Sequence, residues 1–341
     1  MVLAIVCLVL LAFSFLVNIG QFFGGAGSVQ PVRSRTAGPR LDEVILEDND
    51  ARSKIAVLDI DGIITSRAID QSGFTMVDLL KTQLERAKED DKVKAVILRV
   101  DSPGGEVLAS DEIFRIISDF QDTSRKPVIA SMGNLAASGG YYVSAPCRWI
   151  VANKLTITGS IGVIMHTWNY RELMNKVGLQ PSVYKSGKFK DMLSGERNPD
   201  EIPREEHAMV QALIDETYSR FTNVVALGRN RAYEDSSHTG KPLSDEWAEY
   251  ADGRVLSGTK AEELGFVDEL GNFKDAVNRA KELGKVHDKA NLIRYQQRYD
   301  LADVLHIFGK TEAPVIKVDL GVETPKLQAG QLYFLSPAFM H

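Results

Sequence analysis

The stretch VKAVILRVDSPGG, residues 93–105, decides the fold class of this chain. Its first part is rich in β-branched side chains, as expected of a buried strand, and a Ser-Pro-Gly-Gly turn follows at once. Similar apolar runs stand at 54–60 (KIAVLDI) and 127–132 (PVIASM), separated by amphipathic stretches at 77–87 and 107–120. Strands that alternate with helices in this way predict an α/β fold with a parallel sheet and covering helices.

The alternation continues beyond residue 132 and fades toward the C-terminus. Apolar residues recur at helical spacing over one long stretch, which predicts a single long helix there. The expected helices lie at 170–177, 201–230 and 273–283, and the expected strands at 149–153, at 160–165, near Val183 and, as an edge strand, at 331–336.

The N-terminal segment is uncharged, since no Asp, Glu, Lys or Arg occurs before Arg33, and its residues 2–23 are apolar apart from Ser14, Asn18, Gly20 and Gln21. A helix over residues 2–23 would rise about 33 Å, enough for a bilayer core of about 30 Å. A cleaved signal peptide is the alternative, but the run is long for one and no A-x-A-like cleavage site follows it. We therefore expect a transmembrane anchor at 1–24 that contacts the lipid bilayer through residues 2–23, and a linker rich in Pro and Gly at 25–53.

Composition narrows the class of protein further. The chain has 341 residues, 44% of them hydrophobic, and a net charge of -6, which excludes disordered and collagen-like classes. The mild acidity argues against nucleic acid as a partner. Two cysteines, Cys7 and Cys147, are too few for a structural zinc site, and we expect no metal or cofactor.

Two glycine-rich points follow predicted strands, at the sheet edge where ligands of such folds bind. At the first, Gly104 and Gly105 leave backbone N–H groups open to an oxyanion, although a plain tight turn is the alternative. At the second, Ser138 in AASGG presents its hydroxyl at a predicted helix N-terminus, where N–H groups stabilise negative charge. Close packing of small residues is the alternative there.

A serine nucleophile needs a general base. His166 is one candidate, and the lysines of YKSGKFKD at 184–191 are the others. A lysine buried beside a serine can lose its proton near neutral pH, because burial disfavours the ammonium form. Residue chemistry alone does not choose among Lys185, Lys188 and Lys190.

Five motifs follow one another along the chain: DSPGG (101–105), AASGGYY (136–142), TITGSIGV (156–163), YKSGKFKD (184–191) and DGRVLSG with LGFVDELG (252–258 and 264–271). In this order they resemble the signal peptide peptidase A family, which is peptidase family S49 of the ClpP/crotonase superfamily. The resemblance runs from about Lys54 to about Ala276, and the chain length is similar to the short, single-repeat form. It implies a ClpP/crotonase-like βαβ spiral core, a peptidase domain at 54–290 and a tail at 291–341.

The resemblance also implies roles for individual residues. Ser138 would be the nucleophile of a Ser-Lys dyad, Lys190 its general base, and Ser160 a hydrogen-bond partner of that base. Lys185 and Lys188 would be ordinary loop lysines. A His166-based triad of the ClpP kind is disfavoured, because the TGSIG motif occupies the corresponding region. The implied oxyanion hole consists of backbone N–H groups of Gly104, Gly105 and Gly139.

The resemblance implies a membrane-anchored serine endopeptidase that degrades remnant signal peptides or other hydrophobic peptides after secretion. Its catalytic domain would be extracytoplasmic, whereas Arg33, Arg35 and Arg40 after the apolar run favour a cytoplasmic body by the positive-inside rule. Short members of the family form homo-oligomeric rings with sites shared between protomers, and residues 291–341 would then serve oligomerisation. The alternatives are a related protease that cuts stomatin-like membrane proteins, a crotonase-like acyl-CoA enzyme, and a non-catalytic scaffold.

Overall fold

The computed structural model describes residues 38–68, 73–235, 239–298 and 332–335. The chain divides into two compact units, Met1–Gly38 and Pro39–His341, and the described helices and strands all belong to the second. The anchor expected at 1–24 lies outside the described residues. None of the helices in the described part is long and apolar enough to cross a bilayer.

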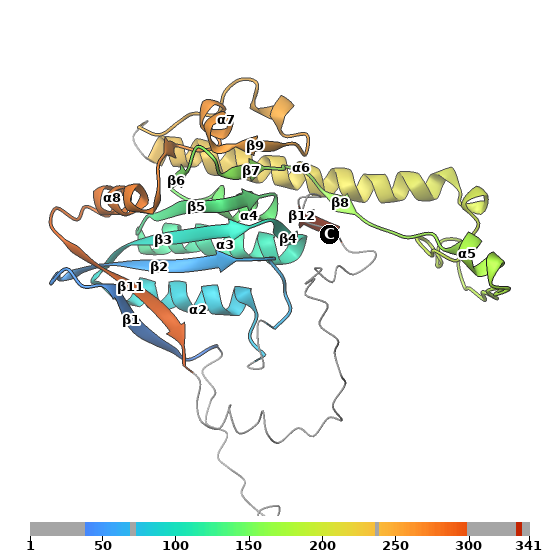
Figure 1. Ribbon diagram of the computed structural model, residues 1–341, viewed down its shortest axis with the longest axis horizontal. Helices are drawn as coiled ribbons and strands as arrows, with labels where there is room; N and C mark the ends of the chain where they lie inside the picture. The colour runs from blue at the N-terminus through green and yellow to red at the C-terminus, as the bar shows by residue number, and fades with distance from the viewer. Residues whose placement is uncertain (1–37, 69–72, 236–238, 299–331, 336–341) are drawn as a thin grey trace, which may run out of the picture. The chain divides into compact units, whose positions relative to one another are not determined.

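A mostly parallel sheet forms the centre of the second unit (Figure 1). Its strands are β1 (Leu41–Glu47), β2 (Ser53–Asp61), β3 (Val93–Ser102), β5 (Val128–Ala137), β6 (Trp149–Ala152), β7 (Ile157–Gly159), β9 (Val255–Ser257), β10 (Glu269–Leu270) and β11 (Ala290–Gln297). They follow the order β1-β11-β2-β3-β5-β6-β10, and β7 joins β5 to β9. The pairs from β11 to β10 are parallel, which confirms the α/β class.

Helices cover both faces of this sheet. α2 (Met76–Glu89) and α3 (Val107–Ser124) pack with one hydrophobic cluster, and α8 (Phe273–Leu283) packs with the other. Side chains of a strand alternate between the two clusters, since successive residues point to opposite faces. Thr75 and Asn272 form capping boxes that fix where α2 and α8 begin. The expected helices at 77–87, 107–120 and 273–283 are thus confirmed.

A second sheet of three antiparallel strands lies beside the carboxyl end of β3. It has the order β4-β12-β8, with β4 (Gly104–Glu106), β12 (Leu332–Leu335) and β8 (Ile164–Met165). The strand expected near the C-terminus therefore exists, but it is the middle strand and not an edge strand. Tyr333, Phe334 and Leu335 are buried, and the ring of Phe334 packs on other aromatic side chains of the core.

The long expected helix is α6 (Arg204–Asp235). The short helix α4 (Gly139–Ser144) contacts it, whereas α5 (Arg171–Lys176) lies near its N-terminal end, away from the main sheet (Figure 1). We call residues 166–203, which join β8 to α6, the lysine arm. No strand forms near Val183, which is exposed, so that expectation is wrong.

A buried ion pair joins α6 to the segment just before β10, and a hydrogen bond joins it to the segment after α4. Arg229 and Asp268 form a salt bridge with both side chains almost fully buried, and Arg229 also donates to the carbonyl of Cys147 at 3.0 Å. Cys147 is a free thiol whose pKa is raised by burial to about 12, so it stays protonated. Cys7 lies outside the described residues.

The folded unit extends further than the expected boundaries at 54 and 290. β1 lies in the expected linker and pairs antiparallel with β11, most of which lies in the expected tail. β1 is easily missed because its side chains are largely exposed after Leu41 and three of its seven residues are acidic. The pairing partner, not the local pattern, makes it a strand. Three smaller helical elements complete the described part, α7 (Gly258–Glu263) and two 3-10 turns at Pro199–Glu201 and Trp247–Tyr250.

Candidate active site

Ser138 lies at the junction where β5 ends at Ala137 and α4 begins at Gly139. Its backbone has φ 53° and ψ −116°, a region that residues with a side chain rarely adopt. The N–H of Ser138 donates to the carbonyl of Gly159 at 2.8 Å, and its carbonyl accepts from Tyr142 N–H at 2.8 Å. Strain of this kind persists only where the surroundings impose it, and it gathers at functional sites.

The hydroxyl of Ser138 is buried and unpaired. The residue is 1% exposed, and its Oγ has no hydrogen-bond partner among the described residues. Such atoms are rare, because a buried polar group without a partner costs about 1–3 kcal/mol. An unpaired hydroxyl at a strained strand-to-helix junction is consistent with a nucleophile whose general base comes from elsewhere.

Glycine backbones surround this serine. A Cβ placed on Gly104 would lie 2.6 Å from the amide nitrogen of Gly139, and one on Gly139 would lie 3.0 Å from the amide nitrogen of Gly105. Gly104 also has φ +103°, which favours glycine. The three expected oxyanion glycines are thus brought together beside Ser138, and the absence of side chains is what allows the close approach.

The three glycine amides are not equivalent. The N–H of Gly104 donates to the hydroxyl of Ser102 at 3.1 Å, and the carbonyl of Gly104 accepts from Ile64 N–H at 2.9 Å. Ser102 is fully buried, so this bond is sheltered from water. In this arrangement Gly104 contributes the turn, and its N–H is already bonded within that turn.

Ser160 is positioned by the strand next to β5. β7 pairs with β5 so that Gly159 lies beside Ala137, and Ser160 follows at once. It is 3% exposed, has φ 50°, and donates its N–H to the carbonyl of Arg254 at 2.7 Å. Because Ser138 bonds to the carbonyl of Gly159, the two serines of the expected site stand at neighbouring strand ends.

An aromatic cluster that sequence reasoning missed closes this site. β12 pairs Phe334 with Gly105, and the ring of Phe334 stacks on Tyr142 with centroids 4.8 Å apart and lies 4.6 Å from Phe221. The hydroxyl of Tyr142 donates to Asp111 at 2.6 Å. The signal was present as apolar residues in QLYFLS, but nothing in the sequence says which strands they join.

The three candidate lysines differ in their contacts. Lys185 Nζ lies 2.7 and 2.8 Å from the two carboxylate oxygens of Asp191, and Lys188 Nζ lies 2.5 Å from Glu205. Lys190 is exposed and has no ion pair or side-chain hydrogen bond among the described residues. Of the three, Lys190 is therefore the amine without a carboxylate partner in the described part of the chain.

Lys190 does not meet Ser138 within one chain. The loop that carries it packs on the first turn of α6 through Glu205 and Glu206, whereas α4 packs near Phe221. The helix between residues 206 and 221 rises about 22 Å. Figure 1 shows the same separation, with α4 beside the sheet and the lysine arm at the N-terminal end of α6.

Comparison with known proteins decides the family. Residues 121–287 match the model of peptidase family S49. The chain is 41% identical over 242 residues to a Synechocystis protein named as a protease, covering 71% of this chain and 78% of that one. It is 37% identical over 260 residues to an Enterococcus faecium protein named as signal peptide peptidase SppA, covering 75% and 71%. The chain belongs to peptidase family S49.

Solved structures resemble this S49 peptidase more distantly. The 1510-N membrane-bound stomatin-specific protease matches with a TM-score of 0.40 at 17% identity, over 76% of this chain and 98% of that one. ClpP1 of Listeria monocytogenes matches with a TM-score of 0.36 at 16% identity, over 65% and 94%.

Membership of S49 makes this chain a serine peptidase, and its fold is mixed α/β. The crotonase-like acyl-CoA alternative is set aside, because the relatives at 37–41% identity are named as peptidases. His166 is exposed, and it does not bond to the unpaired Ser138 hydroxyl. Among the described residues, no three His, Cys, Asp or Glu side chains gather as a metal site requires.

Proposed function

We propose that this S49 peptidase cleaves peptides with Ser138 of one chain and Lys190 of a neighbouring copy. The proposal rests on one observation, which is that a single chain does not bring the serine and its general base together. Among the described residues the Ser138 hydroxyl is buried without a partner, and Lys190 is the one of the three candidate lysines without an ion pair. The parts of α6 on which the two sites pack are about 22 Å apart along the helix. A head-to-tail ring would bring the arm of each chain to the serine of the next.

The surface of the lysine arm supports a neighbouring copy as the occupant. Large exposed apolar side chains gather on it, and such patches mark interaction sites when they are contiguous. They are Trp168, Tyr170, Leu173, Val177, Leu179, Val183 and Tyr184.

The chemistry follows from these groups. Neutral Lys190 Nζ takes the proton from Ser138 Oγ, and Oγ attacks the carbonyl carbon of the peptide bond. The N–H groups of Gly105 and Gly139 stabilise the oxyanion, and Lys190 returns the proton to the leaving amine. Water then hydrolyses the acyl-enzyme by the same proton transfers in reverse order. Ser160 orients the lysine.

The proposed substrates are hydrophobic peptides, chiefly remnant signal peptides in the membrane. An anchor at residues 2–23 and an extracytoplasmic catalytic domain would hold the site beside such substrates at high effective concentration.

The test is cleavage of a synthetic signal peptide in detergent by the full chain, with mass spectrometry of the products. We expect Ser138→Ala and Lys190→Ala to lose activity by at least about 1,000-fold while keeping their thermal unfolding temperature. Lys188→Ala is the matched control and should keep activity. Full activity in either of the first two variants would contradict the assignment.

A further inference from the structure

One charged residue forms the centre of the region that carries Lys190. Between Gly162 and Arg220, Glu206 is the single side chain that is buried, at 3% exposed. Charged residues are almost never buried unless they are paired. The lysine arm therefore has an ionic centre in place of a hydrophobic core.

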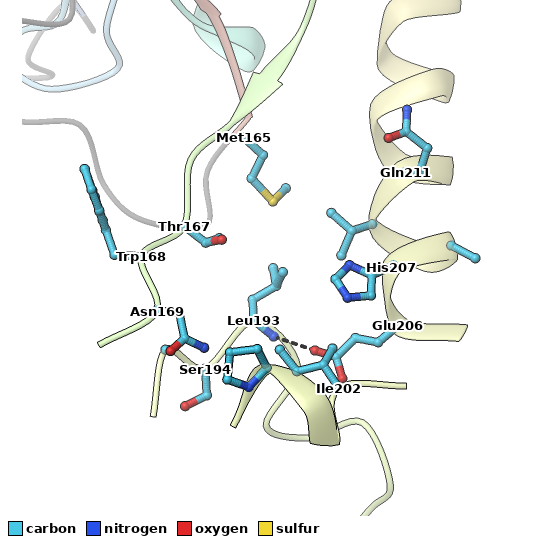
Figure 2. A pocket seen from close by; sticks show the side chains of 14 residues that line it. Met165, Thr167, Trp168, Asn169, Leu193, Ser194, Ile202, Glu206, His207 and Gln211 are labelled. Carbon is cyan, nitrogen blue, oxygen red and sulfur yellow. Dashed lines mark hydrogen bonds between the residues drawn. The ribbon is translucent and has the colours of Figure 1, made fainter. Parts of the chain in front are cut away.

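Glu206 holds two points of the arm at once. Its Oε2 accepts from Arg197 at 2.6 Å, and its Oε1 accepts from the N–H of Leu193 at 3.1 Å, the bond drawn in Figure 2. Leu193 has φ +65°, which a bulky side chain adopts only under constraint. Burial alone would raise the pKa of Glu206, but the bonds from Arg197 and Leu193 outweigh it and the pKa is lowered. The carboxylate is thus charged when it fixes this turn.

The network then reaches the residue next to Lys190. Arg197 Nε lies 3.6 Å from Asp191, and the same carboxylate binds Lys185. Both Arg197 and Asp191 have side chains only 13% exposed. Ion pairs with this burial are screened less by salt than exposed ones. Asp191 and Leu193 are therefore fixed on the C-terminal side of Lys190, which itself makes no such bond.

We propose that Glu206 and Arg197 are positioning residues for catalysis, which hold the arm so that Lys190 projects toward the serine of a neighbouring copy. The inference rests on the proposed function. Neither residue touches substrate. Each acts through Asp191 and Leu193 on where the Lys190 amine stands, and a displacement of about 1 Å can cost about 100-fold in rate.

The test compares two adjacent glutamates with the same substitution. Glu206→Gln removes the buried charge. Glu205→Gln removes the exposed partner of Lys188, and the Glu205 side chain is 63% exposed. We expect Glu206→Gln to lower kcat about 10- to 100-fold with little change in KM, and Glu205→Gln to leave both unchanged. Arg197→Lys is the second variant, because it keeps the charge but loses the planar fork, and it should lower kcat in the same direction.

Mixing experiments separate this inference from the proposed function. Glu206→Gln chains have an intact serine and a displaced lysine, so mixing them with Ser138→Ala chains should restore activity, whereas mixing them with Lys190→Ala chains should not. Equal kcat for the two glutamate variants, or equal activity of the two mixtures, would overturn the inference. Full activity of Lys190→Ala would instead show that the proposed function is wrong.

Discussion

The serine half and the lysine half of this peptidase are built by different physical means. Ser138 stands among fully buried strands and glycine backbones, where van der Waals contact leaves no room for a Cβ. Lys190 stands on an exposed arm that ion pairs around Glu206 hold in shape. Close packing determines the first half and charge determines the second. The two halves should therefore respond differently to added volume, to acid and to salt.

The largest effect should come from adding one methyl group to the serine half. In Gly104→Ala the new Cβ would lie 1.9 Å from the carbonyl oxygen of Phe334 and 2.6 Å from the Gly139 nitrogen, so backbone must move. We expect activity to fall more than about 100-fold. Gly62→Ala is the matched control, since Gly62 has φ +72° with nothing within 4 Å. It should cost only about 1–2 kcal/mol of stability, measured by urea unfolding, and keep activity.

The next largest effect, on the free energy of unfolding, should come from ion pairs outside the lysine arm. Asp268→Asn leaves Arg229 buried without its charge partner, and such changes cost about 3–5 kcal/mol. Asp122→Asn breaks the exposed pair with Arg231 and should cost less than about 1 kcal/mol. Equal shifts of the urea midpoint in the two variants would show that burial does not set the strength of these pairs.

Lowering the pH should destabilise the lysine arm before it destabilises the main sheet. The pKa of Glu206 is lowered from its ordinary 4.5, so its stabilising effect is fully present above that pH and is lost as the pH falls through the lowered value. We expect pepsin to cut the chain first within residues 185–197 as the pH decreases from 5 toward 3, with β3 still protected. Glu206→Gln should make the same segment sensitive to a neutral protease at pH 7. Cleavage of β3 at the same rate would contradict this order.

The smallest effect should come from the exposed pair of the arm. Lys188 and Glu205 have side chains 62% and 63% exposed, and pairs of this kind contribute about 0.2–1 kcal/mol at most. Lys188→Met should therefore change kcat by less than about twofold at any salt concentration. A large loss of kcat would indicate that Lys188, and not Lys190, is the general base.

Much of the serine half could be predicted from sequence because its determinants are local. The strand at 93–100, the glycines at 104 and 105 and the serine at 138 follow one another in a pattern that strand-to-helix turns require. The lysine half could not be predicted in the same way. Glu206 looks like any exposed residue of a helix first turn, and its burial depends on Arg197, which arrives from the preceding loop.

Long-range pairing explains the other differences. The sequence of β1 is typical of an acidic linker. It forms a strand because it pairs with β11, which lies about 250 residues later in the chain. β12 reads as an edge strand until β4 and β8 cover both its sides. In both cases the partner strand is far away in the sequence, so no local window contains the information.

Mixing of Ser138→Ala chains with Lys190→Ala chains tests the shared site most directly. Each variant alone should be inactive. In a head-to-tail ring of randomly mixed chains, about one interface in four pairs an intact serine with an intact lysine, so peptide cleavage should recover to about a quarter of the wild-type rate. Mixed oligomers that stay inactive, while wild-type chains treated in the same way keep their activity, would contradict a site shared between neighbouring copies.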